Sequence, residues 1–240
     1  MQFSIRSWSA WAPGITTPHA WQTWAEAPTL PLSEGIPEVN DIPAMQRRRM
    51  NRLSKMAYVV AQGIEYSAQI PQIFCSRHGD LARTIELLQQ LAQNEPLSSM
   101  HFALSVHNAV GGGVSILQGN HSPISSISAG KNRIGAAILE ALNHLVEYDH
   151  VVLIVYDELM PDMYQALERS TEGPYAYALL IAHGNDYNVQ WQDNDTTDAI
   201  NHSVLPPDLQ FLAFLLTDKK QLNYTVNGVQ WQWSKSSSII

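Results

Sequence analysis

The chain has 240 residues, 45% of them hydrophobic, so it can bury a substantial core and a disordered protein is excluded. Its 22 acidic and 14 basic residues give a formal net charge of −8, which offers no general surface for nucleic acid or for an anionic membrane. The lone cysteine, Cys75, excludes an internal disulfide and a cysteine-based zinc site. We therefore expect a globular protein with no metal, no cofactor and no nucleic-acid partner.

The expected location is the cytoplasm. No apolar stretch reaches the roughly 18 to 20 residues that a membrane-spanning helix needs, and the N-terminal residues lack the apolar segment and cleavage site of a secretion signal. A single cysteine also fits a reducing compartment.

The first elements are an expected strand, a long irregular stretch and a helix. Residues Phe3–Trp11 alternate apolar and polar side chains, as a half-buried strand does. Residues 12–43 hold six of the 13 prolines and no long periodic pattern, which predicts a loop-rich excursion fixed to the body by Trp21 and Trp24. Residues 44–66 then carry apolar side chains at helical spacing, which predicts one long helix.

Strands and helices alternate through the rest of the chain, which predicts an α/β fold. Asp80 is placed to cap the start of a helix that runs through Leu91. The other expected elements are strands at Ile73–Ser76, Val151–Tyr156 and Tyr175–Ile181, helices at Ile134–Leu145 and Asp208–Leu216, and a hairpin at Leu222–Trp233 that turns at Asn227-Gly228. Residues 1–240 are expected to form a single domain with a frayed tail at 234–240.

The segment from Asn108 to Lys131 reads NAVGGGVSILQGNHSPISSISAGK. It resembles the segment around the catalytic cysteine of β-ketoacyl synthases, in which a helix with an Asn and small residues leads to Gly, a Gly-Pro turn, a strand and Thr-Ala-Cys. The matching residues are Asn108, Gly112, Ser115, Ile116, Gly119, Pro123, Ser126 and Ile127. The resemblance covers most of residues 45–160, and it implies an abbreviated thiolase-like, layered αβα fold.

In this register, Lys131 takes the position of the catalytic cysteine. Condensation needs a group that accepts an acyl chain and releases it again, whereas an acylated amine is a stable amide. The family also uses two catalytic histidines that follow the nucleophile in the chain. The histidines after Lys131 in this sequence are His144, His150, His183 and His202, and none of them has a sequence setting like the family's. The resemblance therefore implies a pseudo-ketosynthase with no catalytic residues. If Lys131 is buried, its ammonium needs a partner such as Asp157 or Glu158.

Non-catalytic members of this family, the chain length factors, form heterodimers with an active ketosynthase. The abbreviated C-terminal half and the Ser105–Ala109 motif, Ser-Val-His-Asn-Ala, resemble the chain length factors of bacterial aryl polyene pathways. The resemblance implies a subunit that stabilises a ketosynthase and shapes its acyl pocket during polyene elongation, a process similar to polyketide and fatty-acid synthesis. The acyl carrier protein would then be contacted only indirectly, through the ketosynthase.

The resemblance also assigns site residues. It places one nine-residue segment at the partner interface: Ser122, Pro123, Ile124, Ser125, Ser126, Ile127, Ser128, Ala129 and Gly130. It places Met100, His101 and Phe102 beside the partner's acyl tunnel, where bulky side chains would limit chain length. Ordinary interface packing of these three residues is an equal alternative.

Two other functions stay open. One is a stand-alone hydrolase or acyltransferase that uses Cys75, three residues before His78, or a serine; the chain has no Gly-x-Ser-x-Gly elbow to support it. The other is a purely structural assembly subunit with no effect on product length. The spacing of His101, His107 and His121 matches no common metal site.

Overall fold

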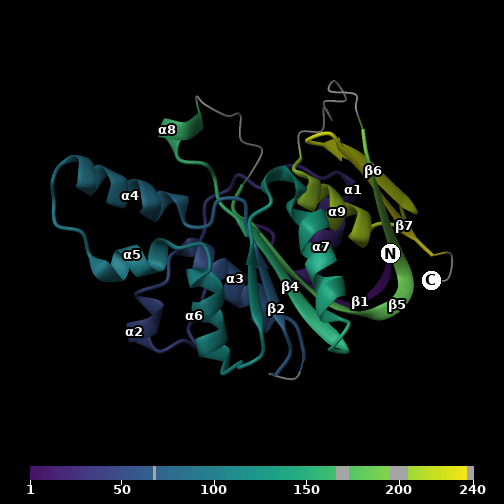
Figure 1. Cartoon of the computed structure of the whole chain (residues 1–240), viewed down its shortest axis with the longest axis horizontal. Coiled ribbons are helices and arrows are strands. Elements are labelled where there is room, and N and C mark those ends of the chain that lie inside the picture. Colours follow the sequence, from purple (N-terminus) through teal and green to yellow (C-terminus); the bar gives the residue numbers. More distant parts are fainter. Residues whose placement is uncertain (67–68, 166–172, 195–204, 237–240) are drawn as a thin grey trace.

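The computed structural model describes residues 1–66, 69–165, 173–194 and 205–236. In these residues, seven strands form one sheet with helices on both faces (Figure 1). The strands are β1 (Gln2–Trp11), β2 (Gln72–Cys75), β3 (Ile124–Ile127), β4 (His150–Asp157), β5 (Tyr175–Asp193), β6 (Gln221–Val226) and β7 (Val229–Lys235). The helices are α1 (Pro18–Glu26), α2 (Ala44–Arg47), α3 (Arg52–Gln62), α4 (Leu81–Ala92), α5 (Ser99–Ser105), α6 (Ala109–Gln118), α7 (Arg133–His144), α8 (Asp162–Gln165) and α9 (Pro207–Leu216), and a 3-10 turn, η1 (Gly130–Asn132), precedes α7.

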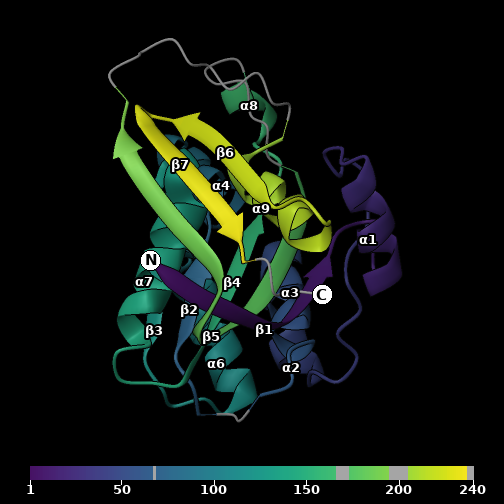
Figure 2. The ribbon, with the colours of Figure 1, turned by 90° about the vertical axis from the view of Figure 1, so that its right-hand side faces the viewer.

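The strand order is β3-β2-β4-β5-β7-β6, and β1 also pairs with β5. β2 is parallel to both β3 and β4, whereas β5 is antiparallel to β1, β4 and β7. The first part of β5 lies between β1 and β4, and its second part pairs with β7 (Figure 2). β3 is therefore a terminal strand of the sheet.

Two hydrophobic layers cover the sheet. Alternate residues of the buried strand β4 point to opposite faces, so Val151, Leu153 and Val155 belong to one layer and Val152 and Ile154 to the other. The first layer contains apolar residues of α1, α7 and α9, and the second contains those of α3 and α6. The predicted αβα layering is confirmed.

Most of the predicted elements are present. The strands predicted at residues 3–11, 73–76 and 151–156 correspond to β1, β2 and β4, and the predicted Asp80 cap accepts a hydrogen bond from the Arg83 amide. The hairpin turns at Asn227 and Gly228, whose positive φ angles of 49° and 74° suit an Asn-Gly turn.

The predicted loop-rich stretch at residues 12–43 contains a helix that its prolines obscured. Thr17 caps α1, and Pro18 occupies the first helical position, where a missing amide hydrogen costs nothing. Trp21, Trp24 and Ala25 are the buried face of this helix, at helical spacing.

The single helix predicted at residues 44–66 is wrong, because the segment forms two helices. The chain leaves helical conformation after α2, and the Asn51 side chain starts α3 by accepting a hydrogen bond from the Ser54 amide. Met45, expected on the apolar face, is 71% exposed.

Two further boundaries differ from the prediction. β5 extends to Asp193 because its second half pairs residue by residue with β7. The frayed tail expected from residue 234 is wrong at Ser234 and Lys235, which belong to β7, and residues 237–240 lie outside the described part. None of the helices in the described ranges is long and apolar enough to cross a membrane.

Candidate functional site

The position assigned to the nucleophile lies where β3 gives way to α7. The chain leaves β3 at Ile127, turns at Gly130 with a φ of 54°, and passes through η1 into α7. The carboxyl ends of the parallel strands β2 and β4 lie beside this turn, which is where ligand sites form in α/β folds. Lys131 is in η1 and is partly exposed, so its ammonium does not require a buried counter-ion.

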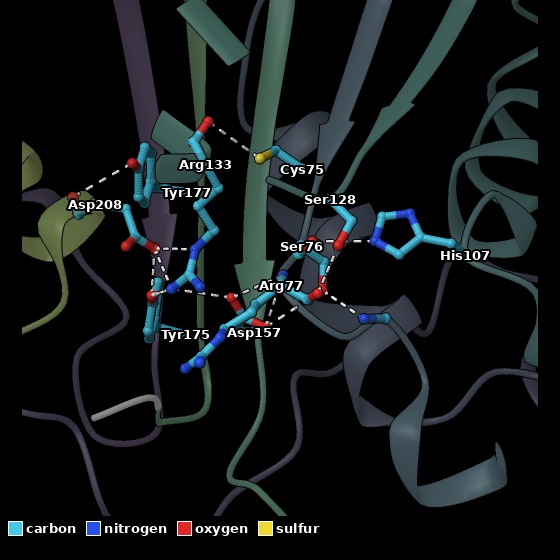
Figure 3. A network of polar contacts seen from close by, with 11 residues as sticks. Cys75, Ser76, Arg77, His107, Ser128, Arg133, Asp157, Tyr175, Tyr177 and Asp208 are labelled. Carbon is cyan, nitrogen blue, oxygen red and sulfur yellow. Dashed lines mark hydrogen bonds and ion pairs between the residues drawn. The ribbon is translucent and has the colours of Figure 1, made fainter. Parts of the chain in front are cut away.

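The buried charge at this site belongs to Arg133, the first residue of α7. Its side chain is 1% exposed, and one Nη lies 3.1 Å from an Asp157 carboxylate oxygen and 2.8 Å from an Asp208 carboxylate oxygen. The same nitrogen donates to the Tyr175 hydroxyl at 2.8 Å, and the Tyr175 hydroxyl donates to Asp208 (Figure 3). Sequence analysis missed the role of Arg133 and of Asp208, and named Asp157 only as a partner for Lys131.

This network joins three distant elements, since Arg133 is on α7, Asp157 ends β4 and Asp208 begins α9. Burial raises the pKa of Tyr175 well above its ordinary value of 10, and the Asp208 carboxylate adds to this effect, so the hydroxyl remains a hydrogen-bond donor. A buried ion pair needs further hydrogen bonds, and Tyr175 supplies one to Asp208 Oδ2, whereas Asp208 Oδ1 is buried with no hydrogen-bond partner among the described residues.

The C-terminal hairpin covers the start of α7 as well. The Trp231 ring lies so close to Gly135 that a Cβ at Gly135 would be 2.3 Å from it, and the Trp231 indole donates to the Asn132 side chain at 3.2 Å. Residues of α9 and β7 therefore pack against Asn132, Arg133 and Gly135, which follow the nucleophile position in the chain.

Cys75 is not arranged as a nucleophile. It is fully buried, its Sγ lies 3.6 Å from the Arg133 carbonyl oxygen, and burial raises the pKa of its thiol far above the ordinary value of 9. The side chain of His78 is exposed to solvent rather than buried beside the thiol. The Cys-His hypothesis therefore has no geometric support.

The environment of Cys75 predicts a thiol that does not react in the folded protein. A water-soluble disulfide reagent should modify native Cys75 at least about 100-fold more slowly than the same thiol in denaturant, because only the exposed thiolate attacks. Native protein that reacts as fast as denatured protein would contradict the burial described here.

Ser76 is also unsuited to nucleophilic catalysis. Its hydroxyl donates to Asp157 at 3.3 Å and accepts from the Gly79 amide at 2.9 Å. His107 contacts the Ser76 carbonyl oxygen rather than the hydroxyl, with Nε2 at 3.0 Å (Figure 3). The arrangement joins the ends of β2 and β4, and the carboxylate that accepts from the hydroxyl is the one paired with Arg133.

The later histidines within the described ranges lie away from Lys131. His150 begins β4 and pairs with Ala182, next to His183, so both histidines are at the amino end of β4, whereas Lys131 follows the carboxyl end of the parallel strand β3. His144 is the last residue of α7, a helix about 18 Å long. His202 lies outside the described residues.

A cavity of about 300 Å³ opens near the carboxyl ends of β2 and β4. Its polar lining residues bind one another: Arg52 pairs with Glu158 at 2.7 Å, and Asn51 donates to Asp80 at 2.7 Å. Lys131 is not part of the lining. Among the described side chains, no three His, Cys, Asp or Glu residues gather as metal ligands.

Both segments assigned to the partner are at the surface. Residues 122–130 are exposed or half-buried along β3, which pairs only with β2 within the described ranges. Met100 and Phe102, on α5, are 47% and 62% exposed, and His101 is half-buried. Figure 1 shows α4 and α5 side by side, projecting from the body.

The comparison with protein families decides the identity of the fold. Residues 21–234 match the model of the β-ketoacyl synthase N-terminal domain. The chain belongs to this family. Its fold is the abbreviated thiolase-like fold that the sequence predicted, and the resemblance is confirmed.

Solved structures of ketosynthase complexes are similar to this one. A chain of "Ketosynthase (ApeO) in Complex with its Chain Length Factor (ApeC) from Xenorhabdus doucetiae" matches with a TM-score of 0.85 and 27% identity, over 98% of this chain and 100% of that chain. A chain of AntDE:AntF, a type II PKS acyl-carrier protein in complex with its ketosynthase, matches with a TM-score of 0.67 and 12% identity, over 98% of this chain and 99% of that chain. The ishigamide ketosynthase/chain length factor matches with a TM-score of 0.65 and 13% identity, over 83% of this chain and 69% of that chain. The last two show the fold alone, and a search of curated proteins finds no match.

Proposed function

We propose that this chain is a non-catalytic chain length factor subunit, which forms a heterodimer with an active ketosynthase and shapes its acyl pocket during polyene elongation. The observation that carries the proposal is the end-to-end similarity to a chain of the ApeO–ApeC ketosynthase complex. That similarity spans the whole of both chains, so it includes the abbreviated C-terminal part.

The chemistry of the nucleophile position supports a non-catalytic role. Lys131 offers an amine where condensation needs a thiol that can release its acyl group. The residues that follow Lys131 are packed: Arg133 is held by Asp208, and Trp231 lies against Gly135. Cys75, the chain's one thiol, is buried with its Sγ 3.6 Å from the Arg133 carbonyl oxygen.

The open edge of β3 supports the partner interface. On the side that faces β2, the Pro123 carbonyl oxygen accepts from the Gln72 backbone amide, and the Ile127 carbonyl oxygen accepts from the Ser76 backbone amide. Backbone groups alternate in direction along a strand, so the amides and carbonyls of Ile124 and Ser126 point away from β2. A partner strand that pairs with this edge would satisfy these groups, and the nine-residue segment 122–130 is the interface we propose.

The projecting α4–α5 pair supports contact with the partner's acyl pocket. Several apolar side chains on these helices and on the residues that flank α5 are 43–62% exposed: Leu88, Leu91, Leu97, Met100, Phe102 and Val106. Exposed apolar side chains gathered on two helices mark an interaction surface. We propose that Met100, His101 and Phe102 reach the ketosynthase tunnel and limit the length of the growing chain.

This role predicts a change in product length. Replacing Met100 and Phe102 by alanine should lengthen the polyene, because a removed side chain frees space for additional carbons at the tunnel end. The product distribution is measured by mass spectrometry, with Met45→Ala as the control for an exposed methionine elsewhere. An unchanged distribution would favour the purely structural subunit.

The carrier protein is expected to dock on the ketosynthase, since an acidic carrier is repelled by a chain of net charge −8. Reconstitution with a candidate ketosynthase from the same gene neighbourhood tests the proposal as a whole. The ketosynthase should elongate efficiently only when this chain is present, and this chain alone should produce nothing. Elongation or acyl hydrolysis by this chain alone would overturn the proposal.

A further inference from the structure

A polar cluster lies beside the open edge of β3. The Ser125 hydroxyl donates to a Glu140 carboxylate oxygen at 2.7 Å, and His144 Nε2 lies 3.3 Å from the same hydroxyl and 3.4 Å from the same carboxylate oxygen. Ser125 is on β3, and Glu140 and His144 are one turn apart on α7. The three residue types are those of a hydrolase triad, but Glu140 contacts the nitrogen that faces the serine, so the geometry is not catalytic.

The cluster is half-buried in the isolated chain. Glu140 is 32% exposed and His144 is 16% exposed at the side chain, and the Tyr148 ring packs edge-on against His144. A strand that pairs with β3 would remove more water from the carboxylate. Ser125 and His144 both contact the same carboxylate oxygen, so the other oxygen needs a donor or a cation when it loses water, or association becomes costly.

Self-pairing would bring two such carboxylates together. Two strands related by a two-fold axis perpendicular to the sheet run antiparallel, and the same face of each sheet points to the same side. Both copies of α7 would therefore lie on one side of the joined sheet. In the three registers that centre on the outward groups of Ile124 and Ser126, Ser125 is directly opposite Ser125, Ile127 or Pro123 of the copy. The two Ser125 Cα atoms would then be roughly 4.5 to 8 Å apart, each beside a Glu140.

We propose that Glu140, held by Ser125 at the β3 edge, selects the partner: it disfavours a second copy of this chain and favours a strand that presents a donor or cationic side chain there. The inference rests on the proposed function, because it assumes that β3 is the interface. Through its charge rather than through shape, Glu140 would then help to determine which strand pairs with β3.

Glu140→Gln tests this inference, because glutamine keeps an oxygen that can accept from Ser125 but carries no charge. Glu147→Gln, in the exposed turn after α7, is the matched control for the loss of one negative charge. Each variant is compared with the wild-type protein by sedimentation at neutral pH and low salt, alone and with the ketosynthase. Circular dichroism checks that each variant is folded.

The expected result is that Glu140→Gln self-associates about tenfold more tightly, as two like charges at this separation imply, and binds the ketosynthase about tenfold more weakly. Glu147→Gln should match the wild type in both measurements. A Glu140→Gln variant that behaves like Glu147→Gln would overturn the inference while leaving the heterodimer proposal intact. Failure of the wild-type chain to bind any ketosynthase would instead overturn the proposed function.

Discussion

Replacing Arg133 by alanine is expected to lower the free energy of unfolding by about 3–5 kcal/mol, the usual cost of removing one member of a buried ion pair. The substitution leaves Asp157 and Asp208 facing each other without the cation that both contact. It also removes the guanidinium group that donates to the Tyr175 hydroxyl and that links α7 to β4 and α9. Urea denaturation followed by tryptophan fluorescence measures the change.

The control for Arg133 is Arg6→Ala. Arg6 lies 3.8 Å from Asp186, and the two side chains are 52% and 34% exposed, so solvent screens the pair. Its loss should cost less than about 1 kcal/mol. If Arg133→Ala costs no more than Arg6→Ala, the network does not hold the three elements together. If Arg133→Ala cannot be purified in folded form, Arg133→Lys, which keeps the charge but not the planar donor set, should be folded and intermediate in stability.

Ser126→Pro is expected to weaken the heterodimer strongly while leaving the isolated chain folded. Proline has no amide hydrogen, and the amide of Ser126 points away from β2, so the substitution removes a donor from the open edge only. Affinity for the ketosynthase should fall by roughly 100-fold, because the ring also blocks close approach of a partner strand.

Ser126→Ala is the matched control, since it removes the hydroxyl and keeps the amide. It should bind the ketosynthase like the wild type in a titration by isothermal calorimetry. Equal binding by the proline variant would show that the partner does not pair with β3 and would remove the interface assigned to residues 122–130.

The sequence predicted those features that depend on local patterns. Val151–Tyr156 is apolar throughout because β4 is covered on both faces, and Asn227-Gly228 marks the hairpin because both residues adopt positive φ. The break between α2 and α3 was missed because the apolar spacing continues across it. Asn51 was the signal in the sequence that a new helix begins there, since asparagine is a common N-cap residue.

The features missed by sequence analysis depend on residues far apart in the chain. Arg133 and Asp208 are 75 positions apart, and Trp231 meets Asn132 across 99 positions. An arginine two residues after the nucleophile position reads as an ordinary helix start, and Asp208 reads as an acidic residue in a first helical turn. Only the packing of α9 against α7 shows that the two charges are buried together.

We propose that this chain acts as one half of a heterodimer with a ketosynthase. Co-expression with a candidate ketosynthase from the same gene neighbourhood, purification through a tag on the ketosynthase and the mass of the intact complex test this proposal. We expect one copy of this 26.8 kDa chain for each ketosynthase. A ketosynthase that elutes only with itself, while this chain remains a monomer, would show that the heterodimer does not form.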